Sequence, residues 1–156
     1  MEKWIFLIKV KNRPGVLSAI TALFADRGVS IDSLTAHDSS GVGVPFGSAI
    51  LTFAANTGKK EHLKRLLTRL AAVQEVAEFS YADSAHARKS ALARVSLPAD
   101  ALVAALPNGL LCEIVTVSET ETLALLLGPP GLLDSAISTL AAADKLIAMD
   151  STVIVV

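Results

Sequence analysis

The sequence predicts an α+β fold in which one order of elements, β-α-β-β-α-β, occurs twice. Apolar residues alternate along short strand-like segments, helix-like segments carry an apolar stripe, and a small, polar segment interrupts the chain at 83–89. With 156 residues, 52% of them hydrophobic and 19% charged, the chain can form two small cores. We therefore expect a first domain over 1–82, a linker over 83–89 and a second domain over 90–156.

The first domain begins with a segment typical of a strand. Between Trp4 and Val10, apolar residues occupy every second position. A break at 12–15 separates this strand from a helix with an apolar face made of Val16, Ile20, Leu23 and Phe24. The same reasoning gives strands at 31–36, 48–54 and 76–81, and an amphipathic helix after a turn at 56–58. The resulting order is that of a split pair of βαβ units.

The second half repeats this order with little similarity in sequence. We expect a strand at 90–96, a short helix at 98–106, a hairpin of strands at 111–117 and 122–127, a helix from Pro130 and a last strand at 147–156. The segment around Cys112 has the composition of a buried strand, and Cys112 is expected to be a small core residue. The apolar end of the chain requires cover, either as a central strand or by pairing with another chain.

Charge and composition exclude several partners. Residues 1–82 hold 10 basic and 7 acidic side chains, and residues 83–156 hold 4 and 8. Neither half has the dense basic stripe of a nucleic-acid-binding protein. No apolar run approaches the roughly 18 residues of a membrane span, so no membrane partner is expected. The start of the chain lacks the pattern of a signal peptide, which predicts a cytoplasmic protein.

The chain carries no recognisable catalytic or metal-binding constellation. His37, His62 and His86 are scattered over separate elements, and Cys112 is the single cysteine. The glycines at 41 and 43 do not open a helix, so they do not form a phosphate-binding loop. We expect no cofactor and no enzymatic activity. A small enzyme on this scaffold stays an alternative, because a fold does not fix a function.

The segment Lys11–Leu17 is the candidate binding site. A strand that runs through a turn into a helix leaves free backbone N–H groups at the helix start, where the helix dipole favours a carboxylate. Gly15 lets a ligand approach the backbone, and Asn12 can hydrogen bond to the ammonium or carboxylate of an amino acid. The alternative is that Asn12 and Gly15 only build a tight turn.

A family resemblance supports the binding interpretation. The stretch Asn12–Leu17, which reads N-R-P-G-V-L, and the stretch Phe24–Leu34, with Arg27-Gly28 and Ile31-Asp32-Ser33, resemble the ACT domain. In particular, residues 4–81 are similar to the small, regulatory subunit of acetolactate synthase. The length of the chain and a second ferredoxin-like half after a short linker also resemble that subunit. Residues 90–156 match it only in outline.

The resemblance implies a regulatory subunit with no activity of its own. Such subunits form homodimers through their ACT domains, bind valine or a related branched-chain amino acid, and confer feedback inhibition on a thiamine-diphosphate-dependent catalytic subunit. The resemblance assigns effector binding to one turn and to two residues of the facing protomer. The turn residues are Asn12, Pro14, Gly15, Val16 and Leu17, and the facing residues are Ser30 and Ile31.

The sequence departs from the family at two positions that concern this assignment. Ser30 stands where the family usually has asparagine, which offers more hydrogen bonds. The loop over 40–49 lacks the arginine that the family carries before its third strand. The alternative prediction is therefore a free-standing ACT-domain sensor that binds an amino acid and regulates a different enzyme.

Overall fold

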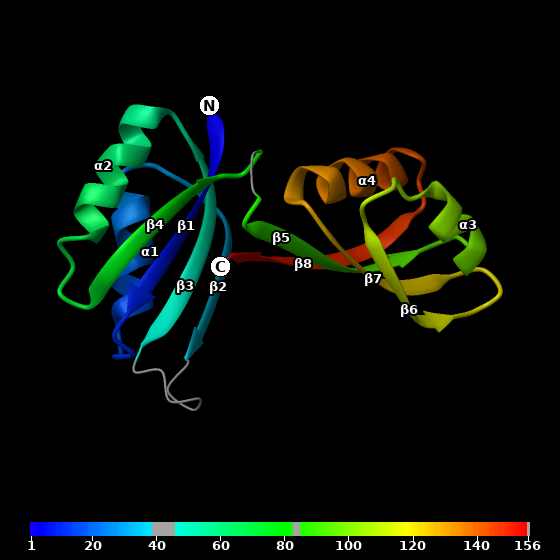
Figure 1. Ribbon diagram of the computed structural model, residues 1–156, viewed down its shortest axis with the longest axis horizontal. Helices are drawn as coiled ribbons and strands as arrows, with labels where there is room; N and C mark the ends of the chain where they lie inside the picture. The colour runs from blue at the N-terminus through cyan, green and yellow to red at the C-terminus, as the bar shows by residue number, and fades with distance from the viewer. Residues whose placement is uncertain (39–45, 83–84, 156) are drawn as a thin grey trace. The chain divides into compact units, whose positions relative to one another are not determined.

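The computed structural model describes residues 1–38, 46–82 and 85–155 (Figure 1). The chain divides into two compact units, Met1–Asp83 and Ser84–Val156. The first unit contains β1 (Glu2–Val10), α1 (Val16–Asp26), β2 (Ile31–Asp38), β3 (Gly47–Ala55), α2 (Thr57–Leu67) and β4 (Val73–Ser80). The second contains β5 (Ala87–Val95), α3 (Ala99–Ala105), β6 (Leu111–Val117), β7 (Thr122–Gly128), α4 (Pro130–Ala142) and β8 (Leu146–Val155).

Each unit is a four-stranded antiparallel sheet with two helices on one face (Figure 1). The strand order is β2-β3-β1-β4 in the first unit and β6-β7-β5-β8 in the second, which is the same order at equivalent positions. Equivalent hydrogen bonds also recur, because Lys11 N donates to Ala72 O and Ser96 N donates to Lys145 O, both at 2.8 Å. The prediction of two tandem ferredoxin-like βαββαβ units in an α+β protein is confirmed.

The first core is built around three phenylalanines. The ring of Phe53 lies edge-on to Phe6 and Phe24, with centroids 4.8 and 5.1 Å apart, and all three side chains are fully buried. Such aromatic pairs stabilise a core beyond the area that they bury. The described core of the second unit is aliphatic: Ala91, Ala93, Val95, Leu102, Ala124, Leu126, Leu133, Ile137 and Leu140.

Three details differ from the sequence prediction. Strand β5 begins at Ala87 and not after Lys89, because residues 87–89 pair with residues 153–155 of β8, so the linker is shorter than expected. Strand β8 forms an edge of the second sheet beside β5, which excludes the central position, one of the two alternatives for the apolar end of the chain.

The third difference concerns β6, which is an exposed edge strand and not a buried one. Its apolar composition does not distinguish an edge from a centre, and here β7 alone pairs with it. Cys112 faces the core and packs against it, but it is only half-buried.

Candidate functional site

The corner between β1 and α1 is shaped by the conformation of Gly15. This residue is the N-cap of α1 and has φ 85° and ψ −7°, in the left-handed region that favours glycine. Its carbonyl oxygen accepts a hydrogen bond from Ala19 N at 2.9 Å, which starts the helix. A Cβ at this position would meet no atom within 4 Å. The left-handed backbone conformation therefore favours glycine at this position, and the space beside Gly15 is open.

The first turn of α1 offers free hydrogen-bond donors. No side chain caps this helix, and none of the hydrogen bonds among the described residues uses the backbone N–H of Leu17 or Ser18. Both donors lie at the positive end of the helix dipole, where an anion is stabilised. The corner can therefore accept a carboxylate.

A pocket of about 360 Å³ opens at this corner. One wall is the β1–α1 connection itself, from Val10 to Ser18. The other wall comes from the end of β2 and the beginning of β3. It consists of Ala36, His37, Asp38, Gly47 and Ser48. The volume suits a small molecule of the size of an amino acid, and the pocket is open to solvent.

The second wall depends on pairing between distant parts of the chain. Val10 pairs with Gly47, and Gly47 pairs with Asp38, so three strand ends meet at one point. A Cβ on Gly47 would lie 2.9 Å from the backbone oxygen of His37, which explains glycine at this position. Ser48 Oγ lies 3.1 Å from Nε2 of His37, so this wall carries two hydrogen-bonding side chains.

The connection carries two cations next to this polar wall. Lys11 and Arg13 are exposed, line the pocket and form no ion pair with a described residue. Asp38 is the acidic residue in the lining. With free N–H groups on one side and a carboxylate on the other, the pocket can hold both ends of a zwitterion.

The sequence prediction identified one wall of the pocket. All five residues predicted from the turn line it: Asn12, Pro14, Gly15, Val16 and Leu17. Ser30 and Ile31 lie at the start of β2, at the opposite end of the strand from His37, and a single chain does not bring them to the pocket. Sequence reasoning missed His37, Asp38 and Ser48, because only the strand register places them beside the turn.

The second unit closes the corner that is equivalent to this pocket. Thr122 takes the place of Gly47, because it pairs with Val95 as Gly47 pairs with Val10. Its buried hydroxyl donates a hydrogen bond to Leu97 O at 2.7 Å, and the Leu97 side chain packs against the core. An apolar residue and a threonine therefore fill the space that is open in the first unit.

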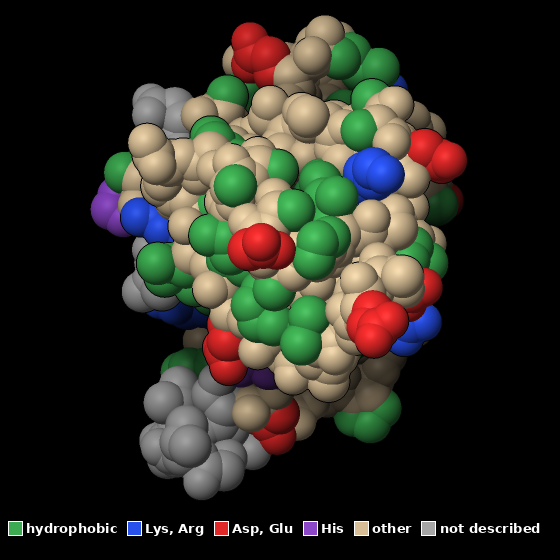
Figure 2. All heavy atoms as spheres, turned by 90° about the vertical axis from the view of Figure 1, so that its right-hand side faces the viewer, with side chains coloured by type: hydrophobic (Ala, Val, Ile, Leu, Met, Phe, Trp, Pro, Cys, Tyr) green, Lys and Arg blue, Asp and Glu red, His purple; other side chains and the backbone are tan. Residues whose placement is uncertain are grey.

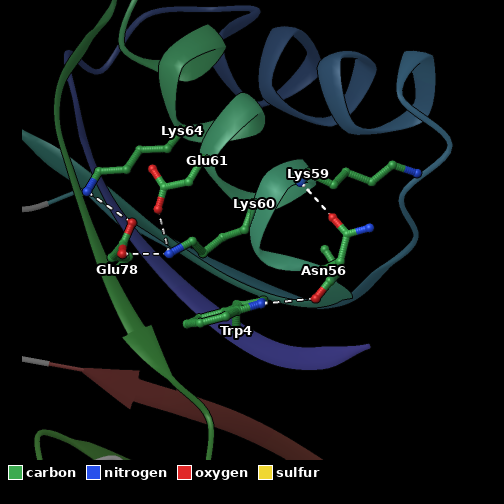
Figure 3. A network of polar contacts seen from close by, with 8 residues as sticks. Trp4, Asn56, Lys59, Lys60, Glu61, Lys64 and Glu78 are labelled. Carbon is green, nitrogen blue, oxygen red and sulfur yellow. Dashed lines mark hydrogen bonds and ion pairs between the residues drawn. The ribbon is translucent and has the colours of Figure 1, made fainter.

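A second polar cluster lies away from the pocket, between α2 and the sheet (Figure 3). Lys60 is buried, its Nζ lies 4.3 Å from the centre of the Trp4 ring, and it donates a hydrogen bond to Glu78 Oε1 at 2.8 Å. Glu61 and Lys64 complete the cluster with ion pairs at 2.8 and 3.0 Å. Its two lysines and two glutamates balance in charge, and the cluster joins α2 to β1 and β4.

The pKa values in this cluster follow from its contacts. Burial alone lowers the pKa of Lys60, but hydrogen bonds to Glu61 and Glu78 more than offset burial and raise it above its ordinary value. The hydrogen bond from Lys60 lowers the pKa of Glu78, although burial opposes this shift. Both groups are therefore held in their charged forms near neutral pH.

The remaining candidates for chemistry do not form a site. Burial raises the pKa of the Cys112 thiol, which keeps it in its unreactive form. Among residues 1–38, 46–82 and 85–155, no cluster of three or more His, Cys, Asp or Glu side chains could hold a metal ion. No helix in that part of the chain is long and apolar enough to cross a membrane.

Comparison with known proteins assigns a class to the first unit. Residues 4–74 match the family model of the ACT domain. Residues 1–83 also have the βαββαβ fold with a pocket at the first strand-to-helix turn. The first unit is therefore an ACT domain, and the resemblance predicted from its motifs is confirmed. An ACT domain indicates an amino-acid-sensing, regulatory role.

One solved structure extends the likeness to the whole chain at the level of fold. The small subunit of acetolactate synthase from Thermotoga maritima matches with a TM-score of 0.76 and 20% identity, over 100% of this chain and 97% of that chain. The regulatory subunit of aspartate kinase from Thermus thermophilus matches with a TM-score of 0.48 and 18% identity, over 91% of each chain. No curated protein matches the sequence.

Proposed function

We propose that this chain is the regulatory subunit of an acetolactate synthase and binds a branched-chain amino acid, with valine as the first candidate. The observation that carries the proposal is the pocket at the β1–α1 corner, where two helix N–H groups have no partner among the described residues. The fold of the whole chain, shared with the small subunit from Thermotoga maritima, supports this choice of partner.

The pocket suggests how the effector is held. Its carboxylate accepts hydrogen bonds from the N–H groups of Leu17 and Ser18, with Arg13 nearby as a counter-charge. Its ammonium group lies toward two acceptors. One is the amide oxygen of Asn12 in the β1–α1 connection, and the other is the carboxylate of Asp38 on the opposite wall. An aliphatic side chain packs against the apolar part of the lining, to which Val16 contributes.

Homodimerisation through the ACT domain completes the site in this proposal. Ser30 and Ile31 of the second protomer then lie against the effector, which explains why one chain does not bring them to the pocket. Binding at an interface couples effector concentration to the association of the protomers, which is a route to feedback control.

In this proposal the chain has no reaction and no cofactor of its own. It acts in the cytoplasm on a thiamine-diphosphate-dependent catalytic subunit, and neither nucleic acid nor membrane is a partner. The alternative is a free-standing ACT sensor for another enzyme. Ser30 and the loop over 40–49, which lacks the arginine of the family, favour this alternative.

Thermal unfolding in the presence of each of the twenty amino acids, at millimolar concentration, tests the proposal. A ligand in hundredfold excess over its Kd stabilises the native state by about 2.7 kcal/mol, so a true effector raises the Tm. We expect a rise with valine, leucine or isoleucine, and its loss in Asn12→Ala. A rise with another amino acid favours the free-standing sensor. No rise with any of them contradicts effector binding.

A reconstitution assay tests the partner separately. The chain is added to a purified catalytic subunit of acetolactate synthase from the same source, and acetolactate formation is followed with and without the effector. We expect inhibition by the effector only in the presence of this chain. An effector that binds the chain but leaves the enzyme unaffected contradicts the choice of partner and leaves the sensor function intact.

A further inference from the structure

His37 and Ser48 form a polar pair on the second wall of the pocket. They lie opposite each other on β2 and β3, and both line the pocket at the β1–α1 corner. Ser48 Oγ lies 3.2 Å from Nδ1 and 3.1 Å from Nε2 of the His37 ring. The Ser48 hydroxyl is therefore within hydrogen-bond distance of either ring nitrogen.

The direction of this hydrogen bond follows from the chemistry of the imidazole. In its neutral form the ring carries a hydrogen on one nitrogen, and the other nitrogen is an acceptor. Because Ser48 Oγ reaches both nitrogens, its hydroxyl can donate to His37 in either tautomer. This hydrogen bond uses the single hydrogen of the hydroxyl and leaves the lone pairs of Ser48 Oγ to accept from a donor in the pocket.

The two walls of the pocket differ in the charge that they favour. The β1–α1 connection presents the N–H groups of Leu17 and Ser18, which have no partner among the described residues. The same connection carries the cations Lys11 and Arg13. These groups attract a carboxylate and repel an ammonium group. An amino acid bound by its carboxylate at this wall therefore has its ammonium group toward the second wall.

The charged groups around Ser48 favour an ammonium group at the second wall. Asp38, next to His37 in the sequence, supplies a carboxylate to the lining. Lys9 is the neighbour of Ser48 on β1, but its Nζ forms an ion pair with Glu75 at 2.7 Å. The charge of Lys9 is therefore balanced by Glu75 and does not keep an ammonium group away from Ser48.

The second unit carries different residues at the equivalent positions. Leu123, which follows Thr122, takes the place of Ser48. Its partner on β6 is Thr116, in the place of His37. This unit faces the viewer in Figure 2, where hydrophobic side chains gather across the middle of the surface and acidic side chains stand singly between them. The imidazole–hydroxyl pair therefore belongs to the unit that has the open corner.

We propose that Ser48, with its hydroxyl oriented by His37, accepts a hydrogen bond from the ammonium group of the effector and thereby selects an amino acid against the keto acid of the same carbon skeleton. The inference rests on the proposed function and adds a third acceptor to Asn12 and Asp38. A keto acid keeps the carboxylate and the side chain but presents a carbonyl oxygen where the amino acid has its N–H donors. Two acceptors would then face each other at Ser48, and polar groups left without a partner cost binding affinity.

Calorimetric titration of the full chain with valine and with its keto acid tests the proposal, and competition with valine measures a weakly bound keto acid. The preference for valine is the ratio of the two dissociation constants. We expect Ser48→Ala to reduce this preference at least about tenfold, because the hydrogen bond that it removes involves a charged group. Ser48→Thr keeps a hydroxyl and should keep the preference.

Ser33→Ala is the matched control for Ser48→Ala. Ser33 Oγ also shares a cross-strand hydrogen bond between β2 and β3, with Thr52 Oγ1 at 2.7 Å, but neither residue lines the pocket. We expect the control to bind valine and the keto acid as the wild type does. An equal fall of the preference in Ser33→Ala and Ser48→Ala overturns the proposal.

Two variants of His37 test its positioning role. His37→Gln offers an amide oxygen as an acceptor for the Ser48 hydroxyl, whereas His37→Phe offers no acceptor. We expect His37→Phe to lose part of the preference for valine and His37→Gln to keep most of it. An equal loss in both variants, or no loss in His37→Phe, overturns the positioning role of His37.

The outcomes separate this inference from the proposed function. A wild-type chain that binds neither valine nor another amino acid contradicts the proposed function itself. Binding of valine by the wild type, with an unchanged preference in Ser48→Ala, overturns the role of Ser48 and leaves the proposed function in place. Equal affinity of the wild type for valine and its keto acid overturns that role as well. Circular dichroism of each variant establishes that it is folded.

Discussion

The two units share a topology but differ in the residues at one corner, and in the first unit this corner forms the pocket between β1, α1 and the ends of β2 and β3. In the first unit, Gly15 has open space beside it, and Gly47, whose backbone lies close to His37, lines the same pocket. In the second unit, Thr122 and Leu97 close the equivalent space with a hydrogen bond and an apolar side chain. The fold supplies the corner in both cases, and the residues at two positions make it a pocket or a packed core.

The cores differ as well, and this difference can be measured. The first core contains Phe6, Phe24 and Phe53, whereas the described second core is aliphatic. Trp4 is the single tryptophan and packs against the first core. Its fluorescence therefore reports the unfolding of the first unit, while circular dichroism reports both units.

The largest expected effect is that of Phe53→Ala. Removal of this fully buried ring takes away both edge-to-face contacts and leaves a cavity, which costs about 3–5 kcal/mol. Chemical denaturation followed by Trp4 fluorescence should show this loss. Leu126→Ala, a fully buried residue of the second core, is the control and should leave the Trp4 transition in place. Equal shifts of that transition in both variants would mean that the units unfold together.

Gly15→Val is expected to abolish effector binding and to reduce stability moderately. A β-branched residue in the left-handed region costs about 1–2 kcal/mol, and its side chain occupies the space beside the helix N-terminus. Gly28→Val is the matched control, because Gly28 has φ 61° and open space around it but does not line the pocket. Calorimetric titration should show binding in the control only. A folded Gly15→Val variant with wild-type affinity would contradict this site.

Thr122→Val tests the closed corner of the second unit. It removes the hydroxyl that donates to Leu97 O and leaves a carbonyl without this partner, which costs about 1 kcal/mol or slightly more. Thr139→Val is the control, since its hydroxyl bonds to Ser135 O on an exposed helix face. Denaturation followed by circular dichroism should show a larger loss of stability for Thr122→Val than for Thr139→Val. An equal loss of stability in both variants would mean that the Thr122 hydrogen bond contributes no more than one on an exposed helix face.

The smallest expected effect is the loss of stability of the first unit as the pH falls. The pKa of Glu78 is lower in the folded state than its ordinary value of 4.5, because Lys60 and Lys64 donate to its carboxylate. Its stabilising contribution is therefore complete above that ordinary value and is lost as pH falls through the folded pKa. Denaturation followed by Trp4 fluorescence at about pH 7 and about pH 3 should show this loss. Glu78→Gln should flatten the profile, and an unchanged acid slope would contradict the assignment.

Much of the fold could be predicted because local patterns determine it. Alternation along β1, the apolar stripe of α1 and the break at 12–15 are properties of adjacent residues. The candidate turn could be predicted for the same reason, since Pro14 and Gly15 favour particular backbone conformations by themselves. The second wall of the pocket could not, because His37 and Ser48 reach it through pairing between distant strands.

The sequence by itself determined the order of elements in both units, the ACT motif and the position of the turn between β1 and α1. Each of these depends on residues within a few positions of one another. Only the tertiary structure decided which strands are edges, because an apolar run such as Leu111–Val117 has the same composition at an edge and in a centre. It also decided that one of two equivalent corners is open, because the packing of Gly47 or Thr122 against a distant turn is a long-range contact.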